Sequence, residues 1–372
     1  MQKLAQSWLV LQLSNSPFLL GLDAFLGELP ILLFSLFGGV AADRKDRRHL
    51  LLMSQVIQMS CAFLLMTLIL LHAVKVWHIL CLSFVTGLAQ AFGGPAYQAL
   101  IPSLVSIENI SNAIALNSIQ FNLARVIGPV LGGLALARLG AAWCFGLNGL
   151  SFVAVIISLL MLHIRFVPAP AKQSVLASMR QGIGFVRKHP VMPSLVVLAF
   201  SMTALGIPLI IFLPVFARDV FRGDVRTYTL LLSTYGVGSI CGALLVAAMG
   251  SRKGKGRIAL GFLVCLGVTM TVFSLSKILA VSCVFLFLSG ASLVGVLSLV
   301  SSLVQEITAD AMRGRVMSVY NVAFRGGTPM GSLVTGSLVP HLGAPVVLAG
   351  NAVLLAVLGI YYLVVQRRVA SL

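Results

Sequence analysis

Charged residues are scarce in this chain. They make up 9% of its 372 residues, and Asp and Glu together number only 9. A soluble protein of this length needs a far larger polar surface to face water. Hydrophobic residues account for 59%, and the mean hydropathy is +1.04. The scarcity of charge therefore excludes a soluble globular domain and predicts a polytopic membrane protein.

Patterns of reactive residues are also missing. The 6 cysteines are scattered singly without a CxxC pair, and the 6 histidines form no HExxH motif. We interpret the cysteines as small buried apolar residues and expect no metal site, no cofactor and no enzymatic activity. The chain also lacks the GxxxxGK[ST] loop that an ATP-driven pump with its own motor would carry.

The excess of positive charge has a topological explanation. A net charge of +17 would indicate a nucleic-acid partner in a soluble domain. Here the cations lie in short loops between apolar segments, so we expect no nucleic-acid partner. The loops at 43–49, 164–190, 250–257 and 302–315 and the C-terminal tail carry roughly three times the Lys and Arg of the alternate loops. The positive-inside rule therefore places these loops and the C-terminus in the cytoplasm, with Trp77 and Trp143 at the opposite interface.

Long apolar segments dominate the rest of the chain. Only helices or closed barrels satisfy the backbone in lipid, and we expect each segment to be a spanning helix. The segments lie at about 18–42, 50–71, 77–100, 111–137, 142–163, 191–217, 227–249, 258–276, 278–301, 313–337 and 342–365. Residues 1–13 are apolar but too short to span. A signal peptide would need a small-residue cleavage site, which Pro17 and the apolar run after it do not offer. We interpret residues 1–13 as the end of a first span whose beginning is missing.

A polar interval divides the chain into two helical bundles. Residues 164–190, which include Pro168 and Pro170, are expected to form a cytoplasmic linker with a short interfacial helix between bundles at 1–163 and 191–372. A weak internal repeat supports the division. Arg125-x-x-x-Pro129 recurs as Arg325-x-x-x-Pro329, and the basic turn at 43–48 is echoed at 251–257. These matches fit parallel repeats related by an axis along the membrane normal.

The turn from Gly39 to Arg48 concentrates charge between the first two full spans. Its cations alone would fix the topology, but Asp43 adds nothing to that task. An acid at the end of a span can receive the N-terminal dipole of an opposing helix. The span that begins near Arg313 lies on the same side. We therefore predict a gating role, with a pure topology marker as the alternative, for Gly39, Asp43, Arg44, Arg47 and Arg48.

Few ionisable residues lie inside the apolar segments. Asp23 and Glu28 are the acids there, and Glu28 lies about 22 Å from Asp43 at helical rise, near mid-membrane. A carboxylate so placed can load a proton on one side and release it on the other. The alternatives are a neutral lining role for Glu28 and an interfacial position for Asp23. Arg125 and Arg325 also lie inside apolar segments, where a cation needs a partner or a water-filled cavity. Asn122 shares a helical face with Arg125. The alternative for both arginines is a structural role, in which each pairs with a neighbouring helix and holds the two helices in register.

The segment Gly128-Pro129-x-x-Gly132-Gly133 combines small residues with a proline. Small residues allow membrane helices to approach closely, and proline frees a backbone carbonyl and permits a bend. We therefore predict a close-packed, bendable seam at these four positions and no contact with a substrate.

Several of these motifs resemble those of the major facilitator superfamily. Gly39-x-x-x-Asp43-Arg44-x-x-Arg47-Arg48 resembles its signature loop between spans 2 and 3. The glycine and proline segment at 128–133 is similar to a motif associated with its antiporters. The segments AQSWLVLQL, FGGPAYQALIPSLV, NAIALNSIQFNLARVIGP and RGRVMSVYNVAF resemble the branch that contains bacterial enterobactin exporters and macrolide efflux proteins.

Two positions depart from the pattern of the superfamily. Asp46 stands where many members have Gly, and Asp tolerates a left-handed turn better than most residues. The span-4 Arg that is common in drug antiporters is replaced near Ser83.

The resemblance implies an all-α major facilitator fold, with two pseudo-symmetric bundles and eleven full spans plus a truncated first span. It further implies export of an amphiphilic small molecule, of drug or siderophore type, by alternating access and proton antiport. We expect a multi-pass protein of the bacterial inner membrane that acts as a monomer, with substrate, protons and lipid as its partners. A lipid or lysolipid translocator without proton coupling, or a non-transporting membrane scaffold, are the alternatives.

Overall fold

The computed structural model describes residues 1–162, 175–250 and 254–372. Within these ranges it contains helices and no strands. Helical structure covers each of the long apolar segments that the sequence predicts, as one continuous helix in all but the segment at 191–217, and α13 and α14 run a full turn beyond their expected ends. The fold is thus the all-helical one expected of a chain whose backbone polar groups must be satisfied in lipid.

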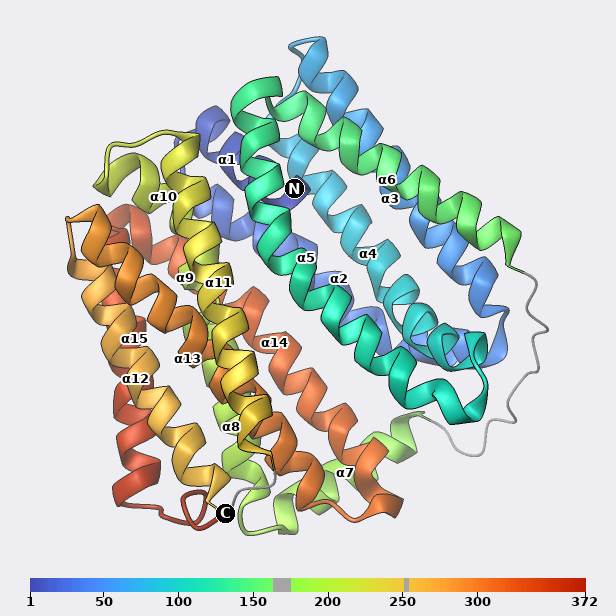
Figure 1. Cartoon of the computed structure of the whole chain (residues 1–372), viewed down its shortest axis with the longest axis vertical. Helices are drawn as coiled ribbons and strands as arrows, with labels where there is room; N and C mark the ends of the chain where they lie inside the picture. Colours follow the sequence, from blue (N-terminus) through green and yellow to red (C-terminus); the bar gives the residue numbers. More distant parts are fainter. Residues whose placement is uncertain (163–174, 251–253) are drawn as a thin grey trace. The chain divides into compact units, whose positions relative to one another are not determined.

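The helices cluster into two compact units, each seen as a bundle in Figure 1. The first unit comprises Met1–Asn15 and Leu22–Val175, and the second comprises Ser16–Gly21 and Leu176–Leu372. The first contains α1 (Gln2–Ser14), α2 (Pro17–Arg44), α3 (Arg47–Leu70), α4 (Val76–Leu100), α5 (Ile110–Leu139) and α6 (Ala141–Met161), with 3₁₀ turns at Ile101–Leu104 and Ile107–Asn109. In this unit α3 packs against α4 and α6, and α1 packs against α4, α5 and α6.

The second unit begins with the short helix α7 (Val175–Lys188), which lies in the interval predicted to be a linker. Pro168 and Pro170 of that interval lie outside the described residues. The long helices are α11 (Val225–Met249), α12 (Lys255–Leu275), α13 (Leu279–Glu306), α14 (Asp310–Leu342) and α15 (Ala344–Val364). Here α11 packs against α13, and α12 packs against α13 and α15. The first residues of the basic turn at 251–257, including Arg252 and Lys253, lie outside the described residues.

One apolar segment of the second unit is broken into short pieces. It consists of α8 (Met192–Ser201), the π-helical turn η3 (Met202–Gly206), α9 (Pro208–Ile211), α10 (Leu213–Val215) and the π-helical turn η4 (Phe216–Val220). Proline cannot donate the hydrogen bond that continues a helix, and its ring clashes with the preceding turn. Pro208 and Pro214 lie in the first two positions of the two short helices, which explains why the segment does not continue as one helix.

Nine helices in the described part of the chain have the length and apolarity needed to cross a membrane. The predicted count of eleven is therefore not confirmed. The other two predicted spans correspond to α5 and α14, which are helices of 30 and 33 residues.

Glycines set the closest helix contacts in both units. A Cβ atom at Gly132 of α5 would lie 2.9 Å from the Cα of Met1, beside α1. A Cβ atom at Gly331 of α14 would lie 1.9 Å from the carbonyl oxygen of Ala204, in η3. Each position therefore requires glycine, because any side chain would push the two backbones apart. The two units share this way of packing α5 and α14 against a neighbouring span.

The interpretation of the cysteines as buried is only partly correct. Cys61 and Cys144 are buried, Cys241 and Cys283 are half-buried, and Cys81 and Cys265 are exposed. The thiol is apolar enough to face lipid as well as a helix interface, so burial does not follow from an apolar sequence context. All of them are free, and the described residues contain no cluster of ligands for a metal ion.

Candidate functional site

A buried carboxylate joins three helices of the first unit. Asp23 of α2 is 7% exposed, and both of its oxygens accept hydrogen bonds from Nε2 of Gln6 in α1, at 3.0 and 2.9 Å. The hydroxyl of Ser83 in α4 donates to Oδ1 of Asp23, and Gln6 also lies 2.8 Å from the Ser83 oxygen. A charged group buried in this way needs such partners, since an unpaired carboxylate is strongly disfavoured away from water. We refer to Gln6, Asp23 and Ser83 as the polar triad.

The polar triad lies well inside the unit. Asp23 and Ser83 are about 9–12 Å along the axes of α2 and α4 from their first residues, and Gln6 is a similar rise from the end of α1. Asp23 is therefore enclosed by protein and lies about two turns inside α2, and its depth in the membrane stays a prediction.

Glu28 lies on α2 about 7–8 Å beyond Asp23 at helical rise. Its side chain is 26% exposed and forms an ion pair of 3.4 Å with Lys3 of α1, whose side chain is 93% exposed. An ion pair with one fully exposed partner contributes little to stability, because water screens it and the long side chain must be ordered. Lys3 and Gln6 therefore bring α1 to both carboxylates of α2, firmly at Asp23 and loosely at Glu28.

Sequence reasoning did not identify Lys3, Gln6 or Ser83 as part of this site. Gln6 is a polar residue in a short apolar helix, and such residues in a membrane require a partner on another helix. Gln2 follows the same rule, since its side-chain oxygen accepts a hydrogen bond of 2.5 Å from Asn148 of α6. The polar residues of α1 were thus a signal that this segment is tied to several neighbours.

The charged turn is shorter than the sequence suggested. Helix α2 runs to Arg44 and α3 begins at Arg47, so only Lys45 and Asp46 separate them. Asp46 has φ −57° and ψ 113°, and its side chain accepts a hydrogen bond of 2.9 Å from the backbone N–H of Arg48. Asp46 therefore serves as the N-cap of α3 and does not adopt a left-handed conformation.

Two arginines of the turn bind the ends of other helices. Arg48 donates from Nε to the carbonyl oxygen of Leu159 at 2.6 Å and from Nη2 to that of Leu160 at 2.7 Å, at the end of α6. Arg47 donates to the carbonyl oxygens of Ala42 at 3.2 Å and Ala99 at 3.0 Å, near the ends of α2 and α4. The final carbonyls of a helix lack partners within it, and cations stabilise that negative end of the dipole.

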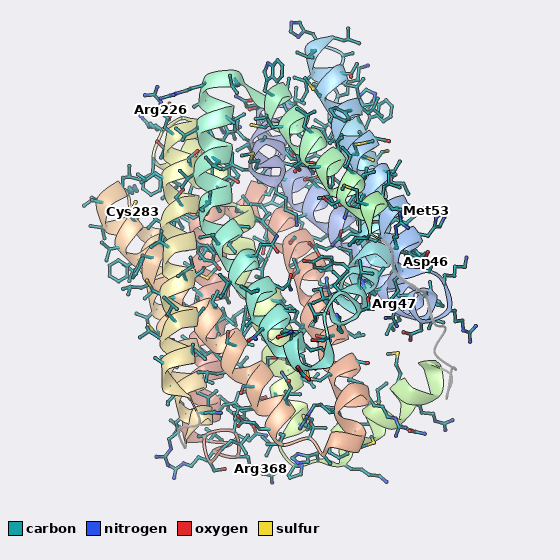
Figure 2. All side chains as sticks on the ribbon, turned by 45° about the vertical axis from the view of Figure 1, so that its right-hand side comes forward. Asp46, Arg47, Met53, Arg226, Cys283 and Arg368 are labelled. Carbon is teal, nitrogen blue, oxygen red and sulfur yellow. The ribbon has the colours of Figure 1, made fainter. Side chains whose placement is uncertain are left out.

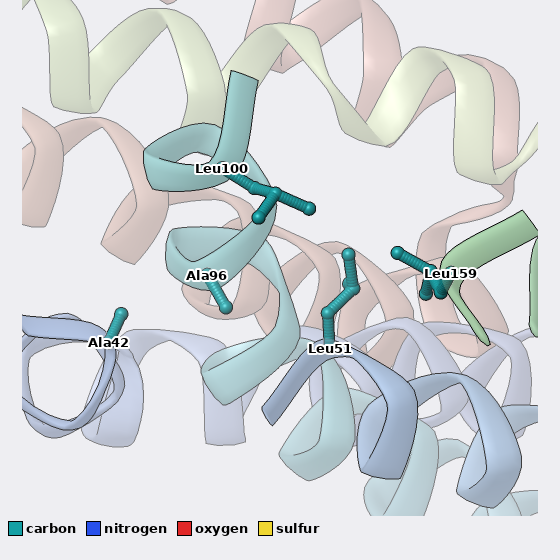
Figure 3. Close-up of a cluster of buried hydrophobic side chains, with 5 residues drawn as sticks. All are labelled: Ala42, Leu51, Ala96, Leu100 and Leu159. Atoms are coloured by element: carbon teal, nitrogen blue, oxygen red, sulfur yellow. The ribbon is translucent and has the colours of Figure 1, made fainter. Parts of the chain in front are cut away.

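An apolar cluster lies at the same helix ends (Figure 3). It contains Ala42 of α2, Leu51 of α3, Ala96 and Leu100 of α4, and Leu159 of α6. Ala42 and Leu159 also supply carbonyls to Arg47 and Arg48. Apolar packing and arginine capping therefore fix the same ends of four helices. We refer to Arg47, Arg48 and this cluster as the capped end of the first unit.

Other residues of the predicted gate face outward. Asp43 and Arg44 are exposed, and a Cβ atom at Gly39 would meet nothing within 4 Å. Figure 2 shows Asp46 and Arg47 at this end of the unit. The helix expected to oppose Asp43 begins near Arg313, in the second unit, and the gating role therefore stays a prediction.

The predicted seam in α5 is partly packed. The helix continues through Pro129 without interruption, Gly132 and Gly133 are buried, and a Cβ atom at Gly128 would meet nothing within 4 Å. The side chains of Asn122 and Arg125 lie outside the described part of the structure.

Arg325 is exposed on α14, and the described residues offer it no ion pair. The proposed interhelical pin at this position is therefore not seen within the second unit.

Comparison with known proteins identifies the family. The model of the transmembrane secretion effector family matches residues 1–371. The multidrug efflux pump Tap of Mycolicibacterium fortuitum is 25% identical over 346 residues, which is 90% of this chain and 84% of that protein. The enterobactin exporter EntS of Shigella boydii serotype 4 is 27% identical, with 88% and 78% covered. The staphyloferrin A transporter of Staphylococcus aureus is 24% identical, with 88% and 82% covered.

Solved structures support the same fold. The nucleoside transporter NupG matches with a TM-score of 0.72 at 14% identity, covering 98% of this chain and 94% of that one. A D-xylose-proton symporter matches with a TM-score of 0.72 at 15% identity, covering 100% and 95%. Sequence identities this low show only that the fold is shared. Taken with the family match over residues 1–371, they show that the chain belongs to the transmembrane secretion effector family of major facilitator transporters.

Proposed function

We propose that this protein exports an amphiphilic small molecule from the cytoplasm, by alternating access and in exchange for protons. Relatives named as an efflux pump and as siderophore transporters support the direction and the kind of cargo. The observation that carries the coupling is the polar triad, in which one carboxylate holds helices α1 and α4 against α2.

Protonation of Asp23 would change the contacts between these helices. In its charged form the carboxylate accepts from both Gln6 and Ser83. A proton adds an O–H donor to the carboxyl, and Nε2 of Gln6 cannot accept it, so the new donor has no partner in the triad unless the bond with Ser83 reverses. A buried group that loses its partner is disfavoured by about 1–3 kcal/mol, which is the size of a typical coupling energy between two sites. Proton binding at Asp23 would therefore alter how α1 and α4 pack on α2.

Glu28 would serve as the second carboxylate. It is partly exposed, and its weak pairing with Lys3 leaves it able to exchange partners during transport. A cationic or hydrogen-bonding cargo could replace Lys3 without a large cost. In this proposal Asp23 responds to protons and Glu28 contacts protons or cargo.

The test uses inverted membrane vesicles with an acidic lumen, and a fluorescent drug is supplied outside, at the cytoplasmic face of the protein. Asp23→Asn cannot change protonation state and should abolish gradient-driven transport while leaving downhill exchange. Glu28→Gln should weaken transport, and Glu108→Gln, which alters an exposed acid of the same unit, should leave it unchanged. Gradient-driven transport by Asp23→Asn at the wild-type rate and protein level would contradict the role of Asp23.

The same vesicles separate the alternative functions. Movement of a fluorescent lysolipid that a protonophore does not affect would favour a lipid translocator. Absence of any transport across a panel of drugs, siderophores and lysolipids would favour a membrane scaffold. We further propose that the protein is a monomer of the inner membrane with a cytoplasmic C-terminus, as the distribution of Lys and Arg in the loops indicates.

A further inference from the structure

A cavity of about 430 Å³ opens beside the last turns of α13 in the second unit. Its lining consists of Ser298, Ser301, Ser302, Gln305 and Glu306 of α13 and Arg313 of α14. The residues of α13 follow a spacing of three and four positions, so they share one face of the helix. That face extends about 12 Å along the axis from Glu306 to Ser298. The volume is within the range of roughly 300–1,000 Å³ that small-molecule sites occupy.

This polar face is unusual for a membrane helix. On the other sides of the same turns, Leu299, Val300, Leu303 and Val304 are buried apolar residues. Consecutive polar side chains would be disfavoured against hydrocarbon and therefore indicate a wet surface. Elsewhere in the unit, serine hydroxyls donate hydrogen bonds to backbone carbonyls of their own helix. Ser289, for example, donates to the carbonyl oxygen of Phe285 at 2.8 Å.

The hydroxyls of the cavity are not all used within the chain. Ser302 donates to Glu306 at 3.2 Å, and Gln305 bonds weakly back to the carbonyl oxygen of Ser301 at 3.3 Å. Ser298, at the deep end, makes no hydrogen bond with any residue that the structure describes. The cavity therefore offers hydroxyl groups to whatever fills it.

The charges around the cavity favour an anion. The carboxylate of Glu306 forms an ion pair with Lys255 of α12, and the ammonium group of Lys255 balances the negative charge of Glu306. Arg313, which also interacts within the chain, adds a guanidinium whose five N–H donors can serve more than one acceptor. A guanidinium matches carboxylate and other oxyanions, and its hydrogen bonds to them are stronger than neutral ones. The combination with several hydroxyl groups suits an anion that also carries hydroxyl or carbonyl oxygens.

We propose that this cavity is a docking site for the anionic, oxygen-rich end of the cargo, which it holds before the cargo moves deeper into the membrane. The site rests on the proposed export function and names the chemistry that the cargo must present. It lies at the end of the unit where the loops rich in Lys and Arg predict the cytoplasm, and this is where an exporter must first meet its substrate.

Isothermal titration calorimetry on the full-length protein in nanodiscs tests the site without any ion gradient. The probes are three six-carbon molecules: gluconate, which has a carboxylate and hydroxyls, sorbitol, which has only hydroxyls, and hexanoate, which has only the carboxylate. Gluconate should bind, and the other two should bind about tenfold more weakly or not at all, since each lacks one set of charge-assisted or neutral hydrogen bonds.

Variants assign the binding to the cavity. Arg313→Gln should weaken gluconate binding about tenfold, as expected for the loss of a charge-assisted hydrogen bond. Arg257→Gln removes the same charge from an exposed position on α12 and should leave binding unchanged. Ser298→Leu fills the deep end without changing charge and should also abolish binding, which guards against a folding defect in Arg313→Gln.

The outcomes separate this site from the proposed function. Equal binding of gluconate and hexanoate, or equal affinity of the wild type, Arg313→Gln and Ser298→Leu, would overturn the site while export could still be observed. Gluconate binding that depends on Arg313 in a protein that exports nothing would instead contradict the export function and leave the binding site standing.

Discussion

Removal of Arg48 should release the end of α6. In Arg48→Ala, the carbonyl oxygens of Leu159 and Leu160 lose donors at 2.6 and 2.7 Å, and Leu159 lies in the buried apolar cluster. A hydrogen bond from a charged donor contributes about 1.5–3 kcal/mol, and Leu160 is on the wetter side, so we count it at the lower end. Loss of a cation from a helix C-terminus costs about 0.3–1 kcal/mol more. The expected destabilisation is therefore about 3–5 kcal/mol.

The measurement is thermal stability in detergent, and its readout is the amount of monodisperse protein that remains after heating. Arg44→Ala is the matched control, because Arg44 is an exposed cation of the same turn whose loss changes the topological charge equally. We expect a clear drop in the melting temperature for Arg48→Ala, a smaller drop for Arg48→Lys, and almost none for Arg44→Ala. Equal melting temperatures for Arg48→Ala and Arg44→Ala would refute the capping role and return Arg48 to a topology marker.

Three further changes test other parts of the chain. Gly132→Leu should separate α5 from α1 and lower thermal stability by about 1–3 kcal/mol, the range for overpacking, whereas Gly128→Leu, where a Cβ meets nothing within 4 Å, should be tolerated. Gly331→Ala should destabilise the second unit, because its Cβ would meet a backbone carbonyl at 1.9 Å, while Gly350→Ala should not; similar melting curves for the two would exclude a tight α14 contact. Asp43→Asn should abolish export from whole cells at normal protein levels if the predicted gate is correct, and undiminished export would remove Asp43 from the mechanism.

The helices and their order could be predicted from the sequence, because apolar length alone decides whether a segment spans. Their ends could not. The sequence placed the end of one span near residue 301, but α13 continues to Glu306 because Lys255 and Ser302 partner its final carboxylate. Residue type likewise did not show that Asp46 caps a helix, because the cap depends on the position of the Arg48 backbone N–H.

The candidate site could be predicted only in part. The carboxylates stood out because acids are rare in apolar segments, but sequence ranked Glu28 above Asp23 by depth. Burial and partners depend on which helices lie side by side, and Gln6 and Ser83 are 77 positions apart in the chain. The arginines of the turn were recognised as important for their charge, while their use as caps depends on carbonyls more than 50 positions away, such as Ala99.

The capped end also has a mechanical consequence. Helix α6 ends at Met161, and the chain then leaves the first unit for the segment that leads to the second. Any pull transmitted along that segment reaches the last turn of α6 first, and the carbonyls of this turn are the ones that Arg48 holds. Because Arg48 lies in the first turn of α3, the load passes across to a second helix and does not unwind the first. The turn that marks this family would then act as an anchor point that joins the last turn of α6 to the first turn of α3.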